Sequence, residues 1–284
     1  MEKTFSFHAV GLMVLAMTLI VSGDAAAKLL SGAGFSPYFV AWTRFSLAAI
    51  VLLPFSGLTR SELVLFKNKY VLLRAVLIAA AICFILTALK TEPIANVFGG
   101  FFIGPVVSYF LSALALKERI TWQRTALLAL SFIGVLMVVK PGFGMTAGMG
   151  FAVLAGCLHG SYLVLTRLLA GQYRAKFLLI SQLLIGSVIL LPFSAISVPA
   201  FDGNIALLII LSALGSAFGN LLLLVVNKTT PASVVAPLVY SQLLAATVIG
   251  YLVFADWPDG LSLLGLGVIM LAGLSSFWLA SRQH

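Results

Sequence analysis

The chain has 284 residues, of which 62% are hydrophobic and only 9% are charged. A soluble domain needs roughly 25% charged residues to cover its surface, so this composition excludes a soluble globular protein and predicts a protein of the lipid bilayer. The net charge of +9 would also suit nucleic-acid binding, but basic residues of membrane proteins collect at the cytoplasmic face, so we expect no nucleic-acid partner.

Ten apolar segments follow one another along the chain, each close to the ~20 residues that a helix needs to cross the hydrocarbon layer. The segments cover residues 8–30, 36–56, 70–90, 93–116, 121–140, 147–169, 177–197, 205–227, 230–254 and 260–280. They must be helices, because an unpaired backbone group in lipid costs several kcal/mol. The sequence therefore predicts an all-α membrane protein with ten transmembrane helices and short connections.

The first segment also resembles a cleavable signal peptide, because Lys3 precedes an apolar run that ends near three alanines at 25–27. Aligning the second half of the chain on the first, however, places Lys28 on Arg167 in the sixth segment. A partner in the second half indicates that the first segment belongs to the fold. We therefore expect it to be retained as a membrane span.

A repeat links the two halves of the chain. A shift of nearly half the chain length makes Pro93, at the start of the fourth segment, fall on Pro231 at the start of the ninth. The run Leu-Leu-Pro-Phe-Ser at 52–56 recurs at 190–194 in the same register. A long internal period of this kind indicates duplication, with one repeat over residues 1–142 and the other over residues 143–284.

Each repeat holds five predicted spans, and an odd number makes the second repeat enter the membrane from the opposite side. With the N-terminus in the cytoplasm, thirteen of the 17 Lys and Arg residues, Arg74 among them, would lie at the cytoplasmic face. Such a bias sets the orientation of a membrane protein. The sequence thus predicts inverted repeats in a multi-pass protein of the cell inner membrane, with both termini in the cytoplasm.

Inverted repeats are typical of transporters, whose binding site lies between the two halves near helices interrupted by Gly or Pro. The predicted breaks in the fourth and ninth spans are Gly99, Gly100, Gly104, Pro105 and Pro237. A proline inside a helix removes a hydrogen bond and exposes carbonyl groups that a polar substrate could use. The same residues also serve helix packing and kinks in membrane proteins, and the sequence leaves both interpretations open.

Charged residues inside a span indicate a functional site by default. Arg44 lies ~12 Å into the second span, and Asp24 lies in the outer half of the first span. One interpretation is a neutralising ion pair of Asp24 with Arg44, or with Lys28 one helical turn away. The other is that Arg44 receives an anionic or carbonyl-rich group of the substrate, while Asp24 takes a proton or holds Arg44 in place.

Uncharged polar residues in the spans complete the predicted site. Tyr240 lies ~14 Å beyond Pro231 along the ninth span and is our first choice after Arg44. His159 could relay a proton, although we favour a hydrogen bond to a neighbour. Aromatic rings could stack on a planar ligand. The residues predicted to contact substrate are Trp42, Arg44, Asn96, Tyr162, Gln182, Tyr240 and Gln242.

The sequence resembles the EamA branch of the drug/metabolite transporter superfamily in both halves. The motifs that carry the resemblance are Trp42-Thr43-Arg44-Phe45, the run ALKTEPIA at 88–95, and Lys117-Glu118-Arg119-Ile120-Thr121. The second half departs from the pattern, with Gln182 in place of Arg44 and Asp256 in an exit without basic residues. The resemblance implies ten helices, an inner-membrane location and transport of small organic solutes such as amino acids, vitamins, nucleotide-like compounds or drugs.

These observations predict a secondary transporter that moves a small polar metabolite by alternating access. The mixture of aromatic residues and one cation favours a vitamin such as riboflavin or an amino-acid-like compound. An exporter of drugs or amino acids is the alternative, followed by an intramembrane enzyme. Neither a nucleophilic triad nor metal-ligand spacing is present in the sequence, so we expect no cofactor and no metal. The expected partners are the substrate and the bilayer, and a homodimer is left open.

Overall fold

The computed structural model describes residues 7–115, 122–194, 202–229 and 238–281, and the regular elements in these ranges are all helices. They are α1 (Phe7–Gly32), α2 (Pro37–Ser56), α3 (Arg60–Leu63), η1 (Val64–Lys67), α4 (Lys69–Leu89), α5 (Ile94–Phe101), α6 (Ile103–Ala115), α7 (Trp122–Val139), α8 (Ala147–Ala170), α9 (Ala175–Ser194), α10 (Gly203–Thr229), α12 (Ser241–Phe254) and α13 (Gly260–Ser281). The prediction of an all-α protein is therefore confirmed.

Seven helical stretches are long and apolar enough to cross a membrane, with α5 and α6 counted as one stretch. Three shorter apolar helices lie at Thr125–Val139, Ser241–Phe254 and Gly260–Ser275. The longest polar connection expected from the sequence, residues 57–69, contains the short helices α3 and η1. The chain is a multi-pass membrane protein.

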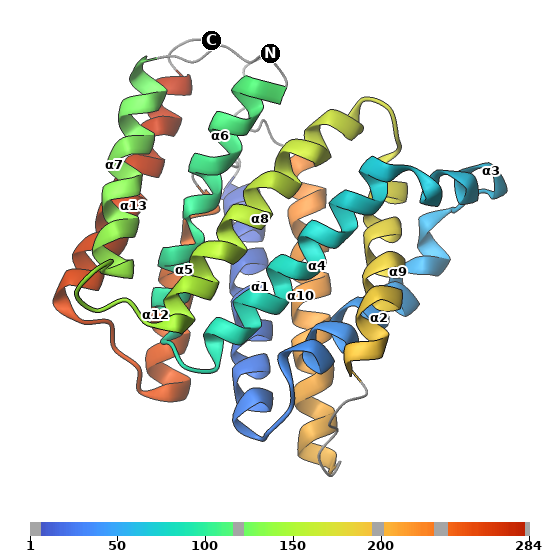
Figure 1. Ribbon diagram of the computed structural model, residues 1–284, viewed down its shortest axis with the longest axis horizontal. Helices are drawn as coiled ribbons and strands as arrows, with labels where there is room; N and C mark the ends of the chain where they lie inside the picture. The colour runs from blue at the N-terminus through green and yellow to red at the C-terminus, as the bar shows by residue number, and fades with distance from the viewer. Residues whose placement is uncertain (1–6, 116–121, 195–201, 230–237, 282–284) are drawn as a thin grey trace.

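Helices from the two halves of the sequence pack side by side. The closest pairs are α1 with α10, α4 with α8, α2 with α9, and α7 with α13. In Figure 1 the bundle has an upper end, where α3 and the turn between α8 and α9 lie, and a lower end, where α1 and α12 finish. Each pair joins one helix before residue 142 to one helix after it, so the interface between the halves runs through the middle of the molecule.

Short polar turns start and stop the helices. At the start of α2, the Ser36 hydroxyl accepts a hydrogen bond from the Phe39 amide, and Pro37 occupies the first turn, where its missing N–H is not needed. The helix stops at Gly57, whose φ of 59° is left-handed and suits glycine. These local signals place the whole of the second predicted span in one helix.

The fourth predicted span is interrupted at Phe102, between α5 and α6. The interruption lies between the predicted breaks: Gly99 and Gly100 belong to α5, whereas Gly104 and Pro105 lie in the first turn of α6. Pro105 is tolerated there because the first turn of a helix has unpaired amides anyway.

The glycines around this interruption serve helix contact. A Cβ atom on Gly104 would lie 3.0 Å from the carbonyl oxygen of Gly156 in α8, and one on Gly160 would lie 2.5 Å from the carbonyl oxygen of Gly104. A Cβ atom on Gly99 would meet the side chain of Val138. The packing interpretation therefore accounts for these glycines, because side chains would separate the helices.

Two glycines in α13 provide a matched test of this packing. A Cβ atom on Gly265 would lie 2.6 Å from the carbonyl oxygen of Gly134 in α7, whereas Gly267 has nothing within 4 Å. Gly265→Ala should therefore destabilise the protein by about 1–3 kcal/mol through overpacking, while Gly267→Ala should leave the melting temperature unchanged or raise it. Melting curves of the purified proteins decide this, and equal shifts for both variants would contradict the close contact of α7 and α13.

Candidate functional site

A cavity of about 260 Å³ lies between helices of both halves, near the middle of the bundle. Most of its wall is apolar, with a few polar groups from α1, α2, α8, α9, α10 and α12. Six of the residues singled out in the sequence line it: Asp24, Arg44, His159, Tyr162, Gln182 and Gln242. An apolar cavity with a few convergent polar groups is typical of a site for a small organic ligand.

Asp24 and Arg44 form a buried ion pair at the cavity wall. Arg44 Nη1 donates to Asp24 Oδ1 at 2.6 Å, and both side chains are almost fully buried. Arg44 also donates through Nε to the Ser212 hydroxyl at 2.8 Å and through Nη2 to the Gly23 carbonyl oxygen at 2.6 Å. Each guanidinium nitrogen is therefore already engaged within the protein, and Asp24 neutralises the charge.

Lys28 does not pair with Asp24, which corrects one of the two predicted ion pairs. Lys28 Nζ instead donates to Asp256 Oδ2 and to the Glu92 carbonyl oxygen, both at 2.8 Å. Asp256 follows α12, so this ion pair joins the two halves of the chain at the lower end. Within the described protein Asp24 therefore pairs with Arg44, because another acid neutralises Lys28.

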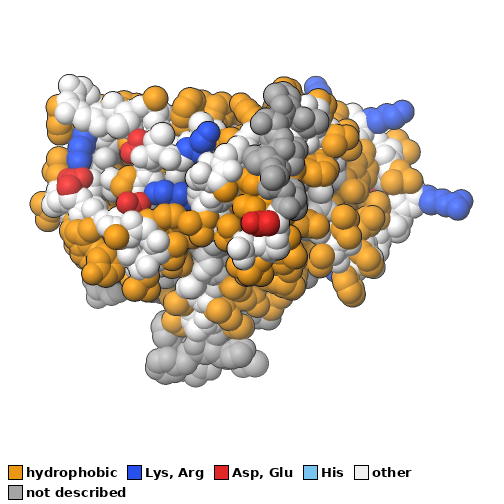
Figure 2. All heavy atoms as spheres, turned by 90° about the horizontal axis from the view of Figure 1, so that it is seen from below, with side chains coloured by type: hydrophobic (Ala, Val, Ile, Leu, Met, Phe, Trp, Pro, Cys, Tyr) orange, Lys and Arg blue, Asp and Glu red, His pale blue; other side chains and the backbone are white. Residues whose placement is uncertain are grey.

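A second ion pair between the halves lies at the same end. Lys140 Nζ contacts Asp259 Oδ2 at 2.5 Å, and this hydrogen bond holds the pKa of Asp259 below its usual value. Figure 2 shows this end of the molecule, where acidic and basic side chains lie close together within a largely hydrophobic surface. The lower end is thus closed by ionic contacts between the halves.

One wall of the cavity combines aromatic rings with amides. The ring of His159 lies 4.9 Å from that of Phe101 and 5.7 Å from that of Tyr162. The Tyr162 hydroxyl donates to Gln182 Oε1 at 2.9 Å. In the described part of the chain His159 makes these ring contacts and no hydrogen bond to a neighbour, contrary to our favoured interpretation. Phe101 is tilted by 42° against His159, which stacks on Tyr162, so the wall offers aromatic rings to a planar group.

Three predicted binding residues lie away from this cavity. Tyr240 packs against Phe102 with a ring separation of 5.0 Å and lies directly on the backbone of Gly273 in α13. Trp42 packs toward Phe39, with ring centroids 6.2 Å apart. Asn96 is absent from the cavity lining, and its buried Oδ1 has no hydrogen-bond partner among the described residues. The predicted break at Pro237 falls outside the described residues.

Arg74 is a cavity residue that the sequence did not single out. The sequence predicts only that it lies at the cytoplasmic face, and in the structure its side chain is 3% exposed and lines a second cavity of about 310 Å³. Tyr162, Leu179, Gln182, Asn220 and Leu223 line both cavities, so the two adjoin. A signal was available in the sequence, because the register that places Pro93 on Pro231 also places Arg74 on another polar residue in an apolar span, Ser212.

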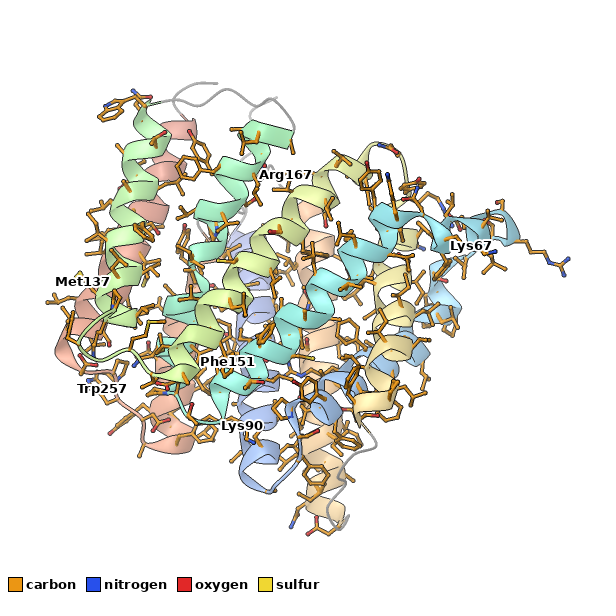
Figure 3. The ribbon with its side chains drawn as sticks, viewed as in Figure 1. Lys67, Lys90, Met137, Phe151, Arg167 and Trp257 are labelled. Atoms are coloured by element: carbon orange, nitrogen blue, oxygen red, sulfur yellow. The ribbon has the colours of Figure 1, made fainter. Side chains whose placement is uncertain are left out.

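The second cavity extends toward the upper end of the bundle. Its lining continues along α8 to Ala170 and into the turn at Tyr173. Figure 3 places Lys67 and Arg167 toward this end and Lys90 and Trp257 toward the opposite end. The two adjoining cavities thus extend from the Asp24–Arg44 pair toward the upper end.

An exposed ion pair holds α3 to the turn before α9 at the upper end. Arg174 donates to both carboxylate oxygens of Glu62, at 2.8 and 2.6 Å, which lowers the pKa of Glu62 from 4.5 to about 2. A carboxyl group with a depressed pKa stabilises the fold above pH 4.5, and this contribution is lost as the pH falls toward 2.

Glu62→Gln should therefore lower the melting temperature modestly at pH 7, and the difference from wild type should shrink as the pH falls from 4.5 toward 2. Melting curves over this range measure it. Arg60→Gln, which removes a charge from the same helix outside this pair, serves as the control. A difference that stays constant down to the lowest pH would show that the Glu62 charge contributes nothing.

A mostly apolar cavity with a few polar groups, enclosed by membrane-spanning helices of both halves that ion pairs join at the lower end, is typical of a membrane transport protein. The chain belongs to the EamA-like transporter family, which matches it twice, over residues 8–140 and again over residues 146–277. Membership in this family identifies a transporter and not an enzyme.

Curated relatives carry a more specific description. The chain is 26% identical over 282 residues to an "S-adenosylmethionine uptake transporter" of Rickettsia bellii, covering 96% of this chain and 94% of the relative. It is 25% identical over 294 residues to the protein of the same description from Rickettsia felis, covering 99% and 97%. A protein known from its crystal structure shares the fold, with a TM-score of 0.65, 17% identity, and coverage of 98% of this chain and 100% of that one.

Proposed function

We propose that this transporter is a secondary carrier built from ten membrane spans in two inverted repeats, 1–142 and 143–284. The double match of the family, once in each half, supports the duplication. The seven long helical stretches and the three shorter ones supply the spans. The pairing of each helix with one from the other half supports an interface at which the halves rock against each other.

The upper end of the bundle is assigned to the cytoplasm of a cell with the carrier in its inner membrane. Described basic residues gather at this end, including Arg60, Lys67 and Lys176, as the orientation rule for membrane proteins requires. The lower end combines fewer basic residues with Asp256 and Asp259. With this orientation the cavity faces the cytoplasm and the ion pairs close the outer side.

The substrate we propose is S-adenosylmethionine or a closely similar metabolite with a planar base and a charged amino-acid group. The relatives' description suggests this compound. The observation that carries the proposal is the composition of the cavity wall, where the Phe101, His159 and Tyr162 rings face the same space as Asp24. The rings suit an adenine base. Asp24 is the one acid among the described lining residues, and its Oδ2, which Arg44 does not use, can accept a hydrogen bond from an ammonium group.

Riboflavin, one of the substrates that the sequence favours, would contact fewer of the groups that line this cavity. Its isoalloxazine ring would stack on the aromatic wall, but the vitamin has no cationic group for Asp24. S-adenosylmethionine carries a sulfonium and an ammonium group as well as a planar base. Import is the proposed direction, because the relatives are described as uptake transporters, and export of a drug or amino acid by the same fold is the second candidate.

Binding and transport by the purified protein test this proposal. We expect S-adenosylmethionine to raise the melting temperature in a concentration-dependent way, because a ligand of the folded state stabilises it by mass action. Proteoliposomes loaded with unlabelled S-adenosylmethionine should exchange it for the labelled compound without ATP. Riboflavin, adenosine and methionine form the comparison panel. Stabilisation and exchange by one of these, with none by S-adenosylmethionine, would contradict the proposed substrate.

A further inference from the structure

Arg74 is a buried cation that has only neutral partners in the described part of the chain. Its Nε donates to the Thr166 hydroxyl at 2.8 Å, its Nη1 to the Leu178 carbonyl oxygen at 2.8 Å, and its Nη2 to the Tyr162 hydroxyl at 2.9 Å. The guanidinium also lies 4.7 Å from the centre of the Tyr162 ring. A guanidinium has five N–H donors, so these three bonds leave two donors on the terminal nitrogens.

The surroundings of Arg44 show what is absent around Arg74. The offset of 138 residues, in which Pro93 falls on Pro231, places Asp24 on Tyr162, Arg44 on Gln182, and Arg74 on Ser212. In the first segment this offset differs by one residue from the alignment of Lys28 on Arg167. In the structure Arg44 bonds to Asp24 and Ser212, whereas Arg74 bonds to Tyr162, which bonds to Gln182. The two polar clusters therefore use equivalent positions of the two repeats.

The clusters differ in charge. The first contains an arginine and an aspartate and is neutral as a whole. In the second, a tyrosine occupies the position of the aspartate, so the positive charge of Arg74 has no internal counter-ion among the described residues. An uncompensated charge buried at the depth of a membrane is strongly unfavourable and is found where it serves a function.

Arg74 also lies where a ligand can reach it. It lines the cavity that adjoins that of the Asp24–Arg44 pair on the side of the upper end, and Tyr162 and Gln182 line both cavities. We propose that Arg74, with Tyr162 and Thr166, forms an anion subsite that binds the carboxylate of the substrate. This inference rests on the proposed function for the identity of the substrate, but the subsite itself is defined by the charge of Arg74.

In this assignment each charged residue of the cavity has a different partner. Arg44 is held by its own aspartate, so it needs no anion from outside. Arg74 receives the substrate carboxylate in a charge-assisted hydrogen bond, while the aromatic wall and Asp24 hold the base and the cationic group. The carrier should accordingly discriminate against a ligand that has the same base and sulfonium group but no carboxylate.

The first experiment tests the subsite without assuming the substrate. Sodium acetate is compared with acetamide, its neutral isostere, in melting curves of the purified wild type and of Tyr162→Asp and Tyr162→Asn. The aspartate supplies Arg74 with an internal counter-ion, whereas the asparagine removes the same ring without adding charge. At about 100 mM, acetate should raise the wild-type melting temperature by about 2–4 °C more than acetamide. The rise should be smaller but still present in Tyr162→Asn, which loses the Tyr162 hydroxyl but keeps the charge of Arg74, and it should be absent in Tyr162→Asp.

The second experiment uses S-adenosylmethionine and its decarboxylated form as competitors for binding. Wild type should bind the intact compound at least about tenfold more tightly, equivalent to about 1.4 kcal/mol. Arg74→Gln should bind the two compounds equally. Size-exclusion profiles establish that each variant is folded, and the comparison of the two ligands on wild type alone already tests the subsite if Arg74→Gln fails to fold.

The outcomes separate the subsite from the proposed substrate. An acetate effect that is specific to wild type and Tyr162→Asn, without binding of S-adenosylmethionine, would support the subsite and reject the substrate. Binding of S-adenosylmethionine at the same affinity as its decarboxylated form, with no acetate effect, would support the substrate and overturn the subsite. An equal acetate effect in wild type and Tyr162→Asp would also overturn it.

Discussion

Arg44→Gln should cost the protein about 3–5 kcal/mol of stability, because it leaves Asp24 buried without a cation. Arg44 provides Asp24 with a hydrogen bond of 2.6 Å at a site where both side chains are almost fully buried. The double variant Asp24→Asn, Arg44→Gln should recover most of this loss, since no charge remains buried. Melting temperature and yield of monodisperse protein from the membrane measure both effects.

The same double variant tests the role of Asp24 in binding. If Asp24 holds the cationic group of the substrate, the folded double variant should lose S-adenosylmethionine exchange by at least about 100-fold, equivalent to about 2.7 kcal/mol. Ser212→Ala, which removes only one neutral hydrogen bond from Arg44, should retain exchange and serves as the control. If the double variant exchanged S-adenosylmethionine at the wild-type rate, the Asp24–Arg44 pair would have only a structural role.

Asp256→Lys should open the lower end of the carrier. The substitution places a second cation against Lys28, which in wild type joins α1 to the segment after α12 by an ion pair of 2.8 Å. Repulsion between like charges destabilises the closed arrangement, so we expect the population that is open at this end to rise at least about tenfold, equivalent to about 1.4 kcal/mol.

Thiol labelling measures this opening. A cysteine in place of Ala27, which is fully buried beside Lys28, reports access from the lower end in a background of Cys83→Ala and Cys157→Ala. Its reaction rate should rise with Asp256→Lys and return toward wild type when Lys28→Asp is added, because the exchanged charges can pair again. An unchanged rate in Asp256→Lys would show that the ion pair does not hold this end closed.

Hydropathy was sufficient to predict an all-helical, multi-pass membrane protein, since a bilayer imposes both a length and an apolar composition on each span. The sequence was less informative about which way each helix faces. Tyr240 and Gln242 are two positions apart, yet Gln242 lines the cavity and Tyr240 packs against Phe102. In a soluble helix the polar side would mark the outer face, but here lipid and protein are both apolar, so the periodicity that sets the rotation is weak.

Arg74 shows how two rules can compete for one residue. Its place near the start of α4 and the excess of basic residues on one side of the membrane predict the cytoplasmic face, but they do not predict that its side chain is buried. Its partners come from α8 and from the carbonyl of Leu178 in α9, far along the chain, and only the folded structure brings them together. Long-range neutral partners of a buried arginine have no local sequence pattern.

The contact between Phe102 and Tyr240 has a mechanical consequence. Phe102 separates α5 from α6, and Tyr240 directly precedes α12 in the other half, with 5.0 Å between the ring centres. Tyr240 is also fixed against the backbone of Gly273. We therefore expect a change of bend at Phe102 to displace the start of α12 at the same time. This contact would couple the movements of the two halves, so that one end closes as the other opens. Solute would then not flow freely through the protein down its gradient.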